Sequence, residues 1–490
     1  MNQNNHVTQT LLKPGMWIGG QHRETSDGGQ QQHYDPSTGQ LLVTTPLAGK
    51  REVDEAVQAA RAAFPAWQKM PAPERRQLLL NIADRIEAEA DNFAAIGALD
   101  AGTPLMVGAA LSAAVPADWF RYYAGWVDKI EGVVPASYNC STFNYVRRVP
   151  FGVVAIITAY NAPMAFIAMK VAPALAAGNT VVIKPSELAP FSVLRFAELC
   201  KEIGIPDGVV NVIPGGIEAG HAIVSHSGVD RISFTGGDRT AKAIMASAAQ
   251  NLTPVSFELG GKSAALIFDD ANLEQAIGLS IQGSIGLLSG QACIAGARIL
   301  AQRGVYEKVV DGLEGMANAL PVGVASNANT VIGPIINEHH FQRILGVIKQ
   351  EQNTGSSRLI CGGKRVGGDL EGGYFIAPTV FADVLPSSSI AQNEIFGPVI
   401  TVTPFDTEEE AIALANNSVY GLAGYVHTES LGRAHRVAQS IEAGLVTVNT
   451  PYPVTANIPF GGFKQSGFGR EGGQDGILEM THTQSILMGI

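Results

Sequence analysis

The run VVAIITAYNAPMAFIAMKVAPALAAGNTVVIK at residues 153–184 combines the patterns of a strand, a helix and a second strand. Residues 153–157 are uncharged and rich in β-branched side chains, which is typical of a buried strand. Pro163 suits the first turn of a helix, and Gly178 suits its C-terminal cap. Residues 180–183 repeat the strand pattern. The stretch therefore predicts a βαβ unit with two parallel strands.

The same alternation continues along the chain. A helix is predicted at 191–203, strands at 209–213 and 231–234, and a further helix at about 239–249. Repeated βαβ units predict an α/β fold with a Rossmann-like, doubly wound parallel sheet, which binds ligands at the carboxyl ends of its strands. Those ends correspond to residues 158–161, 184–187, 214–216 and 235–237.

The flanking regions have other patterns. Residues 1–50 read as extended, residues 51–125 as helical, and residues 260–473 as a second α/β section. The tail, 483–490, reads as a short strand with no evident local partner. In the second section the helix candidates are 271–288, 305–318 and 407–416, and the strand candidates are 298–302, 398–404 and 445–449.

Length, charge and cysteine content limit the class of protein. A chain of 490 residues is too long for one compact core, so we expect at least two domains. The net charge of −11 argues against nucleic-acid binding, which needs a basic footprint. Four cysteines without a C-x-x-C motif do not make a disulfide scaffold and fit a reducing compartment. Together with a polar N-terminus that lacks a signal region, they predict a cytoplasmic protein.

One uncharged segment, 149–169, is long enough to suggest a membrane span. Gly152, Asn161 and Pro163 break it into two short elements. A buried strand followed by a helix is therefore the better interpretation, and we expect no association with a membrane.

Three familiar patterns do not qualify as sites. The glycine-rich run 467–472 matches G-x-G-x-x-G but follows no apolar strand, so it reads as a loop. The segment 261–263 resembles the end of a phosphate-binding loop, yet Ser256 stands where that motif needs glycine. His339 and His340 have no partner at metal-ligand spacing, so no metal site is expected.

Cys293 is the candidate nucleophile. Gly290, Ala292 and Ala295 are small neighbours that leave space around the sulfur, and a thiolate needs such access to attack. The alternative is an ordinary buried core cysteine.

Polar residues at predicted strand ends are further candidates. Glu258 ends an apolar run before two glycines, where partial desolvation would raise its pKa towards that of a useful base. Asn161 could donate from its amide to an oxyanion, and Lys184 with Glu187 suits ribose hydroxyls or phosphate. The alternatives are a surface carboxylate, a turn-capping asparagine and a solvated turn.

Together these segments resemble the aldehyde dehydrogenase superfamily over nearly the whole chain. The resemblance rests on several long motifs in the right order. They are YYAGW (122–126), KVAPALAAGNTVVIKPSE (170–187), FTG (234–236), ELGGKS (258–263), the segment 290–298, EIFGP (394–398) and PFGGFKQSGFGRE (459–471).

The resemblance implies an NAD(P)-dependent oxidation of an aldehyde to a carboxylic acid. Cys293 would attack the carbonyl to give a thiohemiacetal, and Asn161 with the Cys293 backbone N–H would stabilise the oxyanion. Loss of hydride to the nicotinamide leaves a thioester, which water activated by Glu258 would hydrolyse. Members that pass the acyl group to coenzyme A generally lack this glutamate, so we expect a free acid as product.

A set of cofactor-binding residues follows from the same resemblance. Lys184 and Glu187 would meet the adenosine ribose, and Glu394 and Phe396 the nicotinamide end. Because a carboxylate at position 187 should repel a 2′-phosphate, NAD is favoured over NADP, which stays possible. The other expected cofactor residues are Thr158, Thr235, Gly236, Gly237 and Leu259.

Two positions depart from the pattern of the superfamily. Ala159-Tyr160-Asn161 stands in place of Pro-Trp-Asn, so the residues that support the asparagine differ. Gly237 stands where a serine commonly follows Phe-Thr-Gly, which leaves backbone N–H groups to contact phosphate.

The resemblance also implies a substrate tunnel and an assembly. The tunnel residues carry no charge, which predicts an apolar aldehyde: aromatic, terpenoid or medium-chain aliphatic. A homodimer or homotetramer is expected, with an NAD-binding domain (1–131 and 150–258), a catalytic domain (259–475) and small β oligomerisation segments (132–149 and 476–490). The expected tunnel residues are Ala162, Phe166, Met169, Leu287, Ala292, Ile294 and Val454.

Two other functions compete with this interpretation. An NAD-independent cysteine esterase or acyltransferase would need a base for its thiol, and no histidine lies in a convincing motif. A non-catalytic protein on the same fold would not need Cys293, Glu258 and Asn161 together.

Overall fold

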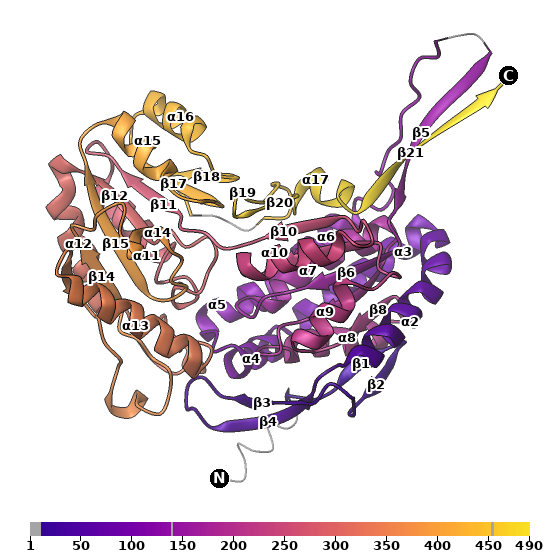
Figure 1. Ribbon diagram of the computed structural model, residues 1–490, viewed down its shortest axis with the longest axis horizontal. Helices are drawn as coiled ribbons and strands as arrows, with labels where there is room; N and C mark the ends of the chain where they lie inside the picture. The colour runs from indigo at the N-terminus through magenta and orange to yellow at the C-terminus, as the bar shows by residue number, and fades with distance from the viewer. Residues whose placement is uncertain (1–10, 139–140, 452–454) are drawn as a thin grey trace.

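The computed structural model describes residues 11–138, 141–451 and 455–490. Two large sheets form the body of the molecule, each covered by helices, and a two-stranded ribbon projects from one end (Figure 1). The α/β fold class that the sequence predicts is confirmed.

The first sheet has eight strands in the order β2-β1-β8-β7-β6-β9-β10-β20. Its five central strands, from β8 to β10, are parallel, whereas β1, β2 and β20 pair antiparallel at the two edges. The parallel centre agrees with the prediction, and the mixed edges were not anticipated. The strands are β2 (Gln21–Arg23), β1 (Met16–Ile18), β8 (Val210–Val212), β7 (Thr180–Lys184), β6 (Val153–Ile157), β9 (Arg231–Thr235), β10 (Val255–Glu258) and β20 (Gly467–Phe468).

Helices cover both faces of this sheet because successive strand residues point to opposite sides. Val154 and Ile156 of β6 pack into the core on one face, and Val153 and Ala155 into the core on the other. In Figure 1, α7 and α8 lie among the helices of this half of the molecule. The helices that follow the central strands are α7 (Pro163–Ala177), α8 (Phe191–Glu202), α9 (Ile217–Val224) and α10 (Asp238–Ala248).

The region that was predicted to be helical precedes the parallel strands of this sheet in the chain. It forms α2 (Lys50–Lys69), α3 (Ala72–Ala88), α4 (Ala90–Asp100), α5 (Leu105–Ala109), a π-helical turn (Ala110–Ala114) and α6 (Val115–Ala124). The preceding extended segment includes the paired strands β3 (Gln30–Tyr34) and β4 (Leu41–Pro46).

The second sheet has seven strands in the order β13-β14-β15-β12-β11-β17-β18, all parallel except β13. The strands are β13 (Arg358–Cys361), β14 (Thr379–Ala382), β15 (Val399–Phe405), β12 (Arg298–Gln302), β11 (Ala264–Ile267), β17 (Ala423–His427) and β18 (Leu445–Val448). Its helices are α11 (Leu273–Gln282), α12 (Tyr306–Ala319), α13 (Glu338–Thr354), α14 (Ser389–Gln392), α15 (Glu408–Asn416) and α16 (Leu431–Ser440). The short pair β16 (Tyr420–Gly421) and β19 (Phe463–Lys464) and the helix α17 (Gly473–Leu478) complete the region.

One expectation about local structure was wrong. The helix expected at 271–288 ends at Gln282, because Gly283 and Gly286 interrupt it before a 3₁₀ turn at Leu288–Gly290. The tail forms a strand, as expected: β21 (Thr481–Gly489) pairs antiparallel with β5 (Thr142–Pro150) along its whole length. That partner lies far earlier in the sequence, where no local pattern reveals it.

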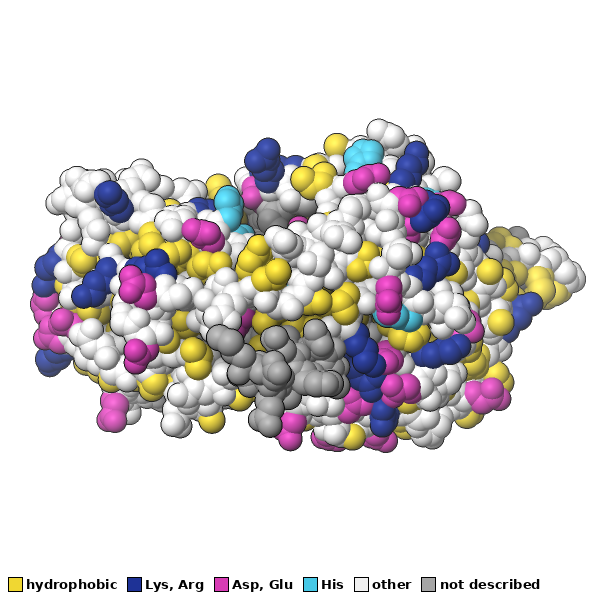
Figure 2. All heavy atoms as spheres, turned by 90° about the horizontal axis from the view of Figure 1, so that it is seen from below, with side chains coloured by type: hydrophobic (Ala, Val, Ile, Leu, Met, Phe, Trp, Pro, Cys, Tyr) yellow, Lys and Arg dark blue, Asp and Glu magenta, His cyan; other side chains and the backbone are white. Residues whose placement is uncertain are grey.

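The surface carries both signs of charge. Figure 2 shows acidic and basic side chains interspersed with apolar ones over the face in view. None of the helices in the described parts of the chain is both long and apolar enough to cross a membrane.

Candidate active site

A crevice of about 900 Å³ runs along the carboxyl ends of β6, β7, β9 and β10 and reaches the second α/β section. Every candidate catalytic residue and every expected cofactor residue lines it. They are Asn161, Glu258 and Cys293, with Thr158, Lys184, Glu187, Thr235, Gly236, Gly237, Leu259, Glu394 and Phe396. Residues from distant parts of the sequence therefore share one cavity.

The turn that carries Cys293 is hydrogen-bonded to the backbone of residues 333–336. Ser289 accepts a hydrogen bond from the backbone N–H of Gly333 at 2.8 Å. The Gln291 side chain accepts from the N–H of Ile336 at 3.1 Å and donates to the carbonyl of Pro334 at 3.1 Å. These contacts fix the path of the backbone into Cys293 from the segment 333–336.

Gly290 is required in this turn. Its φ of 74° lies in the left-handed region, and a Cβ there would stand 2.1 Å from the carbonyl oxygen of Gly397. The glycine lets the Cys293 turn pass close to the EIFGP segment, which carries Glu394 and Phe396.

Asn161 connects the first sheet to the same turn. Its side-chain Nδ2 donates to the carbonyl oxygen of Gln291 at 2.9 Å, and the residue is buried. Since a carboxamide nitrogen carries two hydrogens, one donor of Asn161 is left for another acceptor. The contact orients this group beside Cys293.

The Cys293 thiol lies in a setting that favours its protonated form. Burial raises the pKa of Cys293 to about 12, with the negative charges of Glu394 and Glu258 adding to the rise. The backbone N–H groups of Cys293 and Ile294 act in the opposite direction. The thiol therefore needs a proton acceptor or a nearby positive charge in order to become a nucleophile.

Glu258 is the last residue of β10 and is buried, and its carboxylate oxygen Oε2 has no hydrogen-bond partner in the part of the chain that the structure describes. Burial raises the pKa of Glu258 well above its usual value, and the Glu471 carboxylate raises it further. The charges of Lys170 and Arg470 oppose this rise. A carboxylate with a raised pKa and a free oxygen is suited to accept a proton near neutral pH.

A buried ion pair, Lys170–Glu471, lies close enough to Glu258 to act on its pKa. The sequence reasoning missed this pair. Lys170 of α7 donates to Glu471 in a short contact and to the Ser233 hydroxyl at 3.0 Å. The side chains of Lys170 and Glu471 are 1% and 8% exposed, so the pair lies in the interior. A lone lysine inside the apolar helix 163–177 was the signal in the sequence that could have found it.

The paired glycines after Glu258 allow two close approaches. A Cβ at Gly260 would lie 2.2 Å from the Glu394 carboxylate, and a Cβ at Gly261 would lie 2.5 Å from the carbonyl oxygen of Cys293. The N–H of Gly261 donates to Glu394 at 3.1 Å. Burial raises the pKa of Glu394 to about 7, and that hydrogen bond limits the rise.

The cofactor end of the crevice has an acidic and a basic side chain together. Lys184 Nζ lies 3.4 Å from a carboxylate oxygen of Glu187, whose side chain is 37% exposed. Burial lowers the pKa of Lys184, while the Glu187 charge raises it. The pair offers one donor and one acceptor at the mouth of the crevice.

Further along, the crevice meets the start of α10. Gly237 is the N-cap of this 11-residue helix, and no described atom lies within 4 Å of the position of a Cβ there. The buried hydroxyls of Thr158 and Thr235 have no hydrogen-bond partner among residues 11–138, 141–451 and 455–490. Free hydroxyls beside an open helix N-terminus fit the phosphate and ribose groups of a dinucleotide.

The structure also brings His340 and Arg343 of α13 to the crevice. The His340 ring packs edge-on against Tyr160 at a centroid distance of 5.7 Å, and Phe396 packs against the same tyrosine at 5.8 Å. The sequence reasoning considered His340 only as a metal ligand. Across the described residues, no group of three or more His, Cys, Asp or Glu side chains is placed to bind a metal ion.

The expected tunnel residues divide into separate groups. Phe166 lines the main crevice, whereas Leu287 and Ile294 line a second, smaller cavity. Ala162, Met169 and Ala292 are not among the residues that line either cavity, and Val454 lies outside the described residues. Their role in substrate binding stays a prediction.

Comparison with known proteins agrees with this geometry. Residues 22–486 match the model of the aldehyde dehydrogenase family. The chain belongs to that family. The predicted enzyme class, an NAD(P)-dependent aldehyde dehydrogenase, is therefore confirmed.

Two relatives are similar to the chain over nearly its whole length. The chain is 39% identical over 472 residues to a betaine aldehyde dehydrogenase of Vibrio vulnificus, covering 96% of this chain and 97% of that one. It is 40% identical over 477 residues to aldehyde dehydrogenase family 2 member C4 of Arabidopsis thaliana, covering 96% and 94%.

Solved structures in the family superpose closely. An aldehyde dehydrogenase of Bacillus cereus in complex with NAD⁺ matches with a TM-score of 0.96 at 40% identity, covering 100% of this chain and 99% of that one. A betaine aldehyde dehydrogenase of Staphylococcus aureus in complex with NAD⁺ gives 0.95 at 36% identity, covering 99% and 97%.

Proposed function

We propose that this aldehyde dehydrogenase oxidises an apolar aldehyde to the free carboxylic acid with NAD, through a covalent intermediate on Cys293. The observation that carries the proposal is the presence of Cys293, Glu258 and Asn161 in one crevice with the expected cofactor residues. An apolar substrate is supported by Phe166, Leu287 and Ile294, the expected tunnel residues that line the two cavities.

The first step uses the sulfur of Cys293. Its attack on the aldehyde carbon gives a thiohemiacetal, with the thiol proton leaving to a base. The second amide hydrogen of Asn161 and the N–H of Cys293 stabilise the negative oxygen. The hydrogen bond from Asn161 to Gln291 orients that donor in advance.

The second step uses Glu258. NAD, when bound, supplies the acceptor for the hydride that leaves the thiohemiacetal carbon, and a thioester remains on Cys293. Glu258 takes a proton from water, and the resulting hydroxide attacks the thioester to release the acid and the thiolate. The free oxygen of Glu258 and its raised pKa support this role.

Lys184 and Glu187 would hold the adenosine ribose, and the N-terminus of α10 the pyrophosphate. The relatives from Bacillus cereus and Staphylococcus aureus are seen with NAD⁺, which supports NAD here. The partly exposed Glu187 carboxylate favours ribose hydroxyls over a 2′-phosphate.

A panel of aldehydes tested for NADH or NADPH formation examines the proposal. We expect turnover with apolar aldehydes, faster with NAD than with NADP, and none in Cys293→Ala. Ester turnover without a cofactor and no aldehyde oxidation would instead favour an esterase.

We further propose a homodimer or homotetramer in the cytoplasm. The β5–β21 ribbon supports self-association, since it projects from the body and Leu487 and Met488 are exposed on it (Figure 1). Residues 132–149 and 476–490, which include all of the ribbon except Pro150, are the proposed oligomerisation segments. The proposed domains are 1–131 with 150–258 for NAD and 259–475 for catalysis.

Cys200, Cys293 and Cys361 are free thiols, which fits a reducing compartment.

A further inference from the structure

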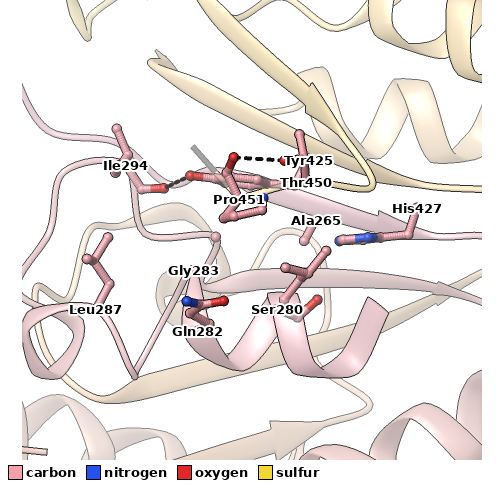
Figure 3. Close-up of a pocket in the computed structure, with 12 residues that line it drawn as sticks. Ala265, Ser280, Gln282, Gly283, Leu287, Ile294, Tyr425, His427, Thr450 and Pro451 are labelled. Atoms are coloured by element: carbon pink, nitrogen blue, oxygen red, sulfur yellow. Dashed lines mark hydrogen bonds between the residues drawn. The ribbon is translucent and has the colours of Figure 1, made fainter. Parts of the chain in front are cut away.

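A second cavity of about 110 Å³ lies between β11, β17, α11 and the segment around Cys293. We call it the side cavity, and Figure 3 shows the residues around it. Leu287 and Ile294 form its wall on the side of the Cys293 segment. No Asp, Glu, Lys or Arg is among its described lining residues.

Small residues create the space. Ala265 of β11 is the register partner of Tyr425 on β17, and its methyl group leaves room beside the larger ring. Gly296 also lines the cavity, and a Cβ there would stand 3.0 Å from the Tyr425 ring. The Tyr425 hydroxyl donates to the carbonyl of Ile294 at 2.7 Å, which ties the cavity wall to the residue after Cys293.

The opposite wall carries buried polar groups. His427 lines it and is 3% exposed. Figure 3 shows its imidazole extending from β17 towards Ala265 and Ser280. Ser280 is 4% exposed, and its hydroxyl has no hydrogen-bond partner among the described residues. A buried hydroxyl is normally hydrogen-bonded, so this one points to a polar ligand atom.

The imidazole in this cavity is uncharged. Burial lowers the pKa of His427 to about 4, so at neutral pH one ring nitrogen donates and the other accepts. Such a group can bind a hydroxyl, which also donates and accepts. A charged group would enter an uncharged, largely apolar cavity at a high desolvation cost.

We propose that the side cavity binds the remote end of the aldehyde substrate and selects an uncharged hydroxyl group there, with His427 and Ser280 as its partners. The inference rests on the proposed role of Cys293, because Ile294, which lines the side cavity, directly follows Cys293 in the chain. Its volume is somewhat below the roughly 150 Å³ of a cavity that holds benzene, so it accommodates a short apolar segment ending in a hydroxyl. The substrate class is thus a hydroxylated apolar aldehyde.

The experiment compares kcat/KM for alkanals and ω-hydroxyalkanals of equal chain length. We expect the hydroxyaldehyde to be preferred by about tenfold at the best length, because a site with unpaired polar groups disfavours an analogue that cannot satisfy them. His427→Leu should abolish that preference, and His427→Gln, which keeps a donor and an acceptor, should retain most of it.

Two further variants separate binding from folding. Ala265→Leu fills the side cavity, so it should raise KM for the longer aldehydes of both series and spare the shortest ones. His435→Leu changes an exposed histidine on α16. It should leave the ratio of kcat/KM for hydroxyaldehyde over alkanal unchanged at every chain length. Melting temperatures identify any variant that does not fold. If His427→Leu does not fold, the results for His427→Gln and Ala265→Leu decide whether the side cavity binds the substrate.

If the active wild-type enzyme has the same kcat/KM for the alkanal and the ω-hydroxyalkanal at every chain length, the inference is overturned. The proposed function would remain intact. A preference that His427→Leu leaves unchanged would do the same. A wild-type enzyme that oxidises no aldehyde of either series would overturn both.

Discussion

The side-chain amide of Asn161 donates a hydrogen bond of 2.9 Å to the backbone carbonyl of Gln291. The contact joins the end of a strand in the first sheet to the turn that carries Cys293 in the second section. It fixes the distance between the oxyanion donor and the nucleophile before substrate arrives, and such preorganisation is the main source of electrostatic catalysis.

Replacement of Asn161 by Asp tests that role. The variant keeps the shape of the side chain but removes the donor and introduces a negative charge beside the developing oxyanion. We expect kcat/KM to fall by about 10²–10³-fold, as for loss of an oxyanion donor elsewhere. Steady-state kinetics measures it, and cofactor binding by calorimetry is the control. A variant with more than half of the wild-type rate would remove Asn161 from the mechanism.

Replacement of Glu471 by Gln tests the charges behind Glu258. The Glu471 carboxylate raises the pKa of Glu258, so its removal should lower that pKa. Deacylation needs the ionised form of Glu258, hence the acidic limb of the kcat–pH profile should move to lower pH. Lys170 would lose its partner in the interior, which costs about 3–5 kcal/mol of stability.

Glu479→Gln is the matched control for that variant. It also breaks an ion pair with a buried cation, Arg231, away from the crevice-lining residues. The control should lose stability and keep the wild-type pH profile. An acidic limb that stays in place in Glu471→Gln would contradict the coupling.

Alkylation of Cys293 reports on its ionisation. Since burial and the nearby carboxylates raise its pKa to about 12, the iodoacetamide rate of the ligand-free enzyme should climb with pH throughout the range from 7 to 9. The oxidised nicotinamide is a cation and should speed the reaction, whereas NADH should not. The experiment uses the Cys361→Ser background, because Cys361 is the other partly exposed thiol among the described residues. A plateau below pH 8 without cofactor would show that the thiol is already activated.

Glu187→Gln tests the choice of cofactor. The substitution removes the negative charge that disfavours a 2′-phosphate and keeps a hydrogen-bonding side chain. The ratio of kcat/KM for NAD over NADP should fall by about tenfold, equivalent to roughly 1.4 kcal/mol. Initial rates with both cofactors measure this ratio. An unchanged ratio would place the discrimination elsewhere in the crevice.

Much of the first sheet could be predicted because its signals are local. The β-branched run of β6 and the caps at Pro163 and Gly178 set the boundaries of the strand and of α7, and Gly178 has the expected left-handed φ of 97°. The position of the crevice could be predicted from the rule that parallel strands present their carboxyl ends at one edge of the sheet.

Long-range contacts escaped prediction because no local pattern encodes them. The pairing of β5 with β21 and the Lys170–Glu471 ion pair each join segments separated by most of the chain. The packing of His340 on Tyr160 likewise depends on how α13 docks, which neither residue reveals by itself.

In the proposed mechanism, Cys293 carries the acyl group and Glu258 releases it. Intact mass spectrometry of Glu258→Gln after incubation with NAD and an apolar aldehyde detects the acyl group on the enzyme. We expect one adduct per chain, heavier by the aldehyde less two hydrogens, and its absence when Cys293 is also replaced by Ala. Rapid steady turnover in Glu258→Gln with no adduct, or an adduct that survives loss of Cys293, would contradict this mechanism.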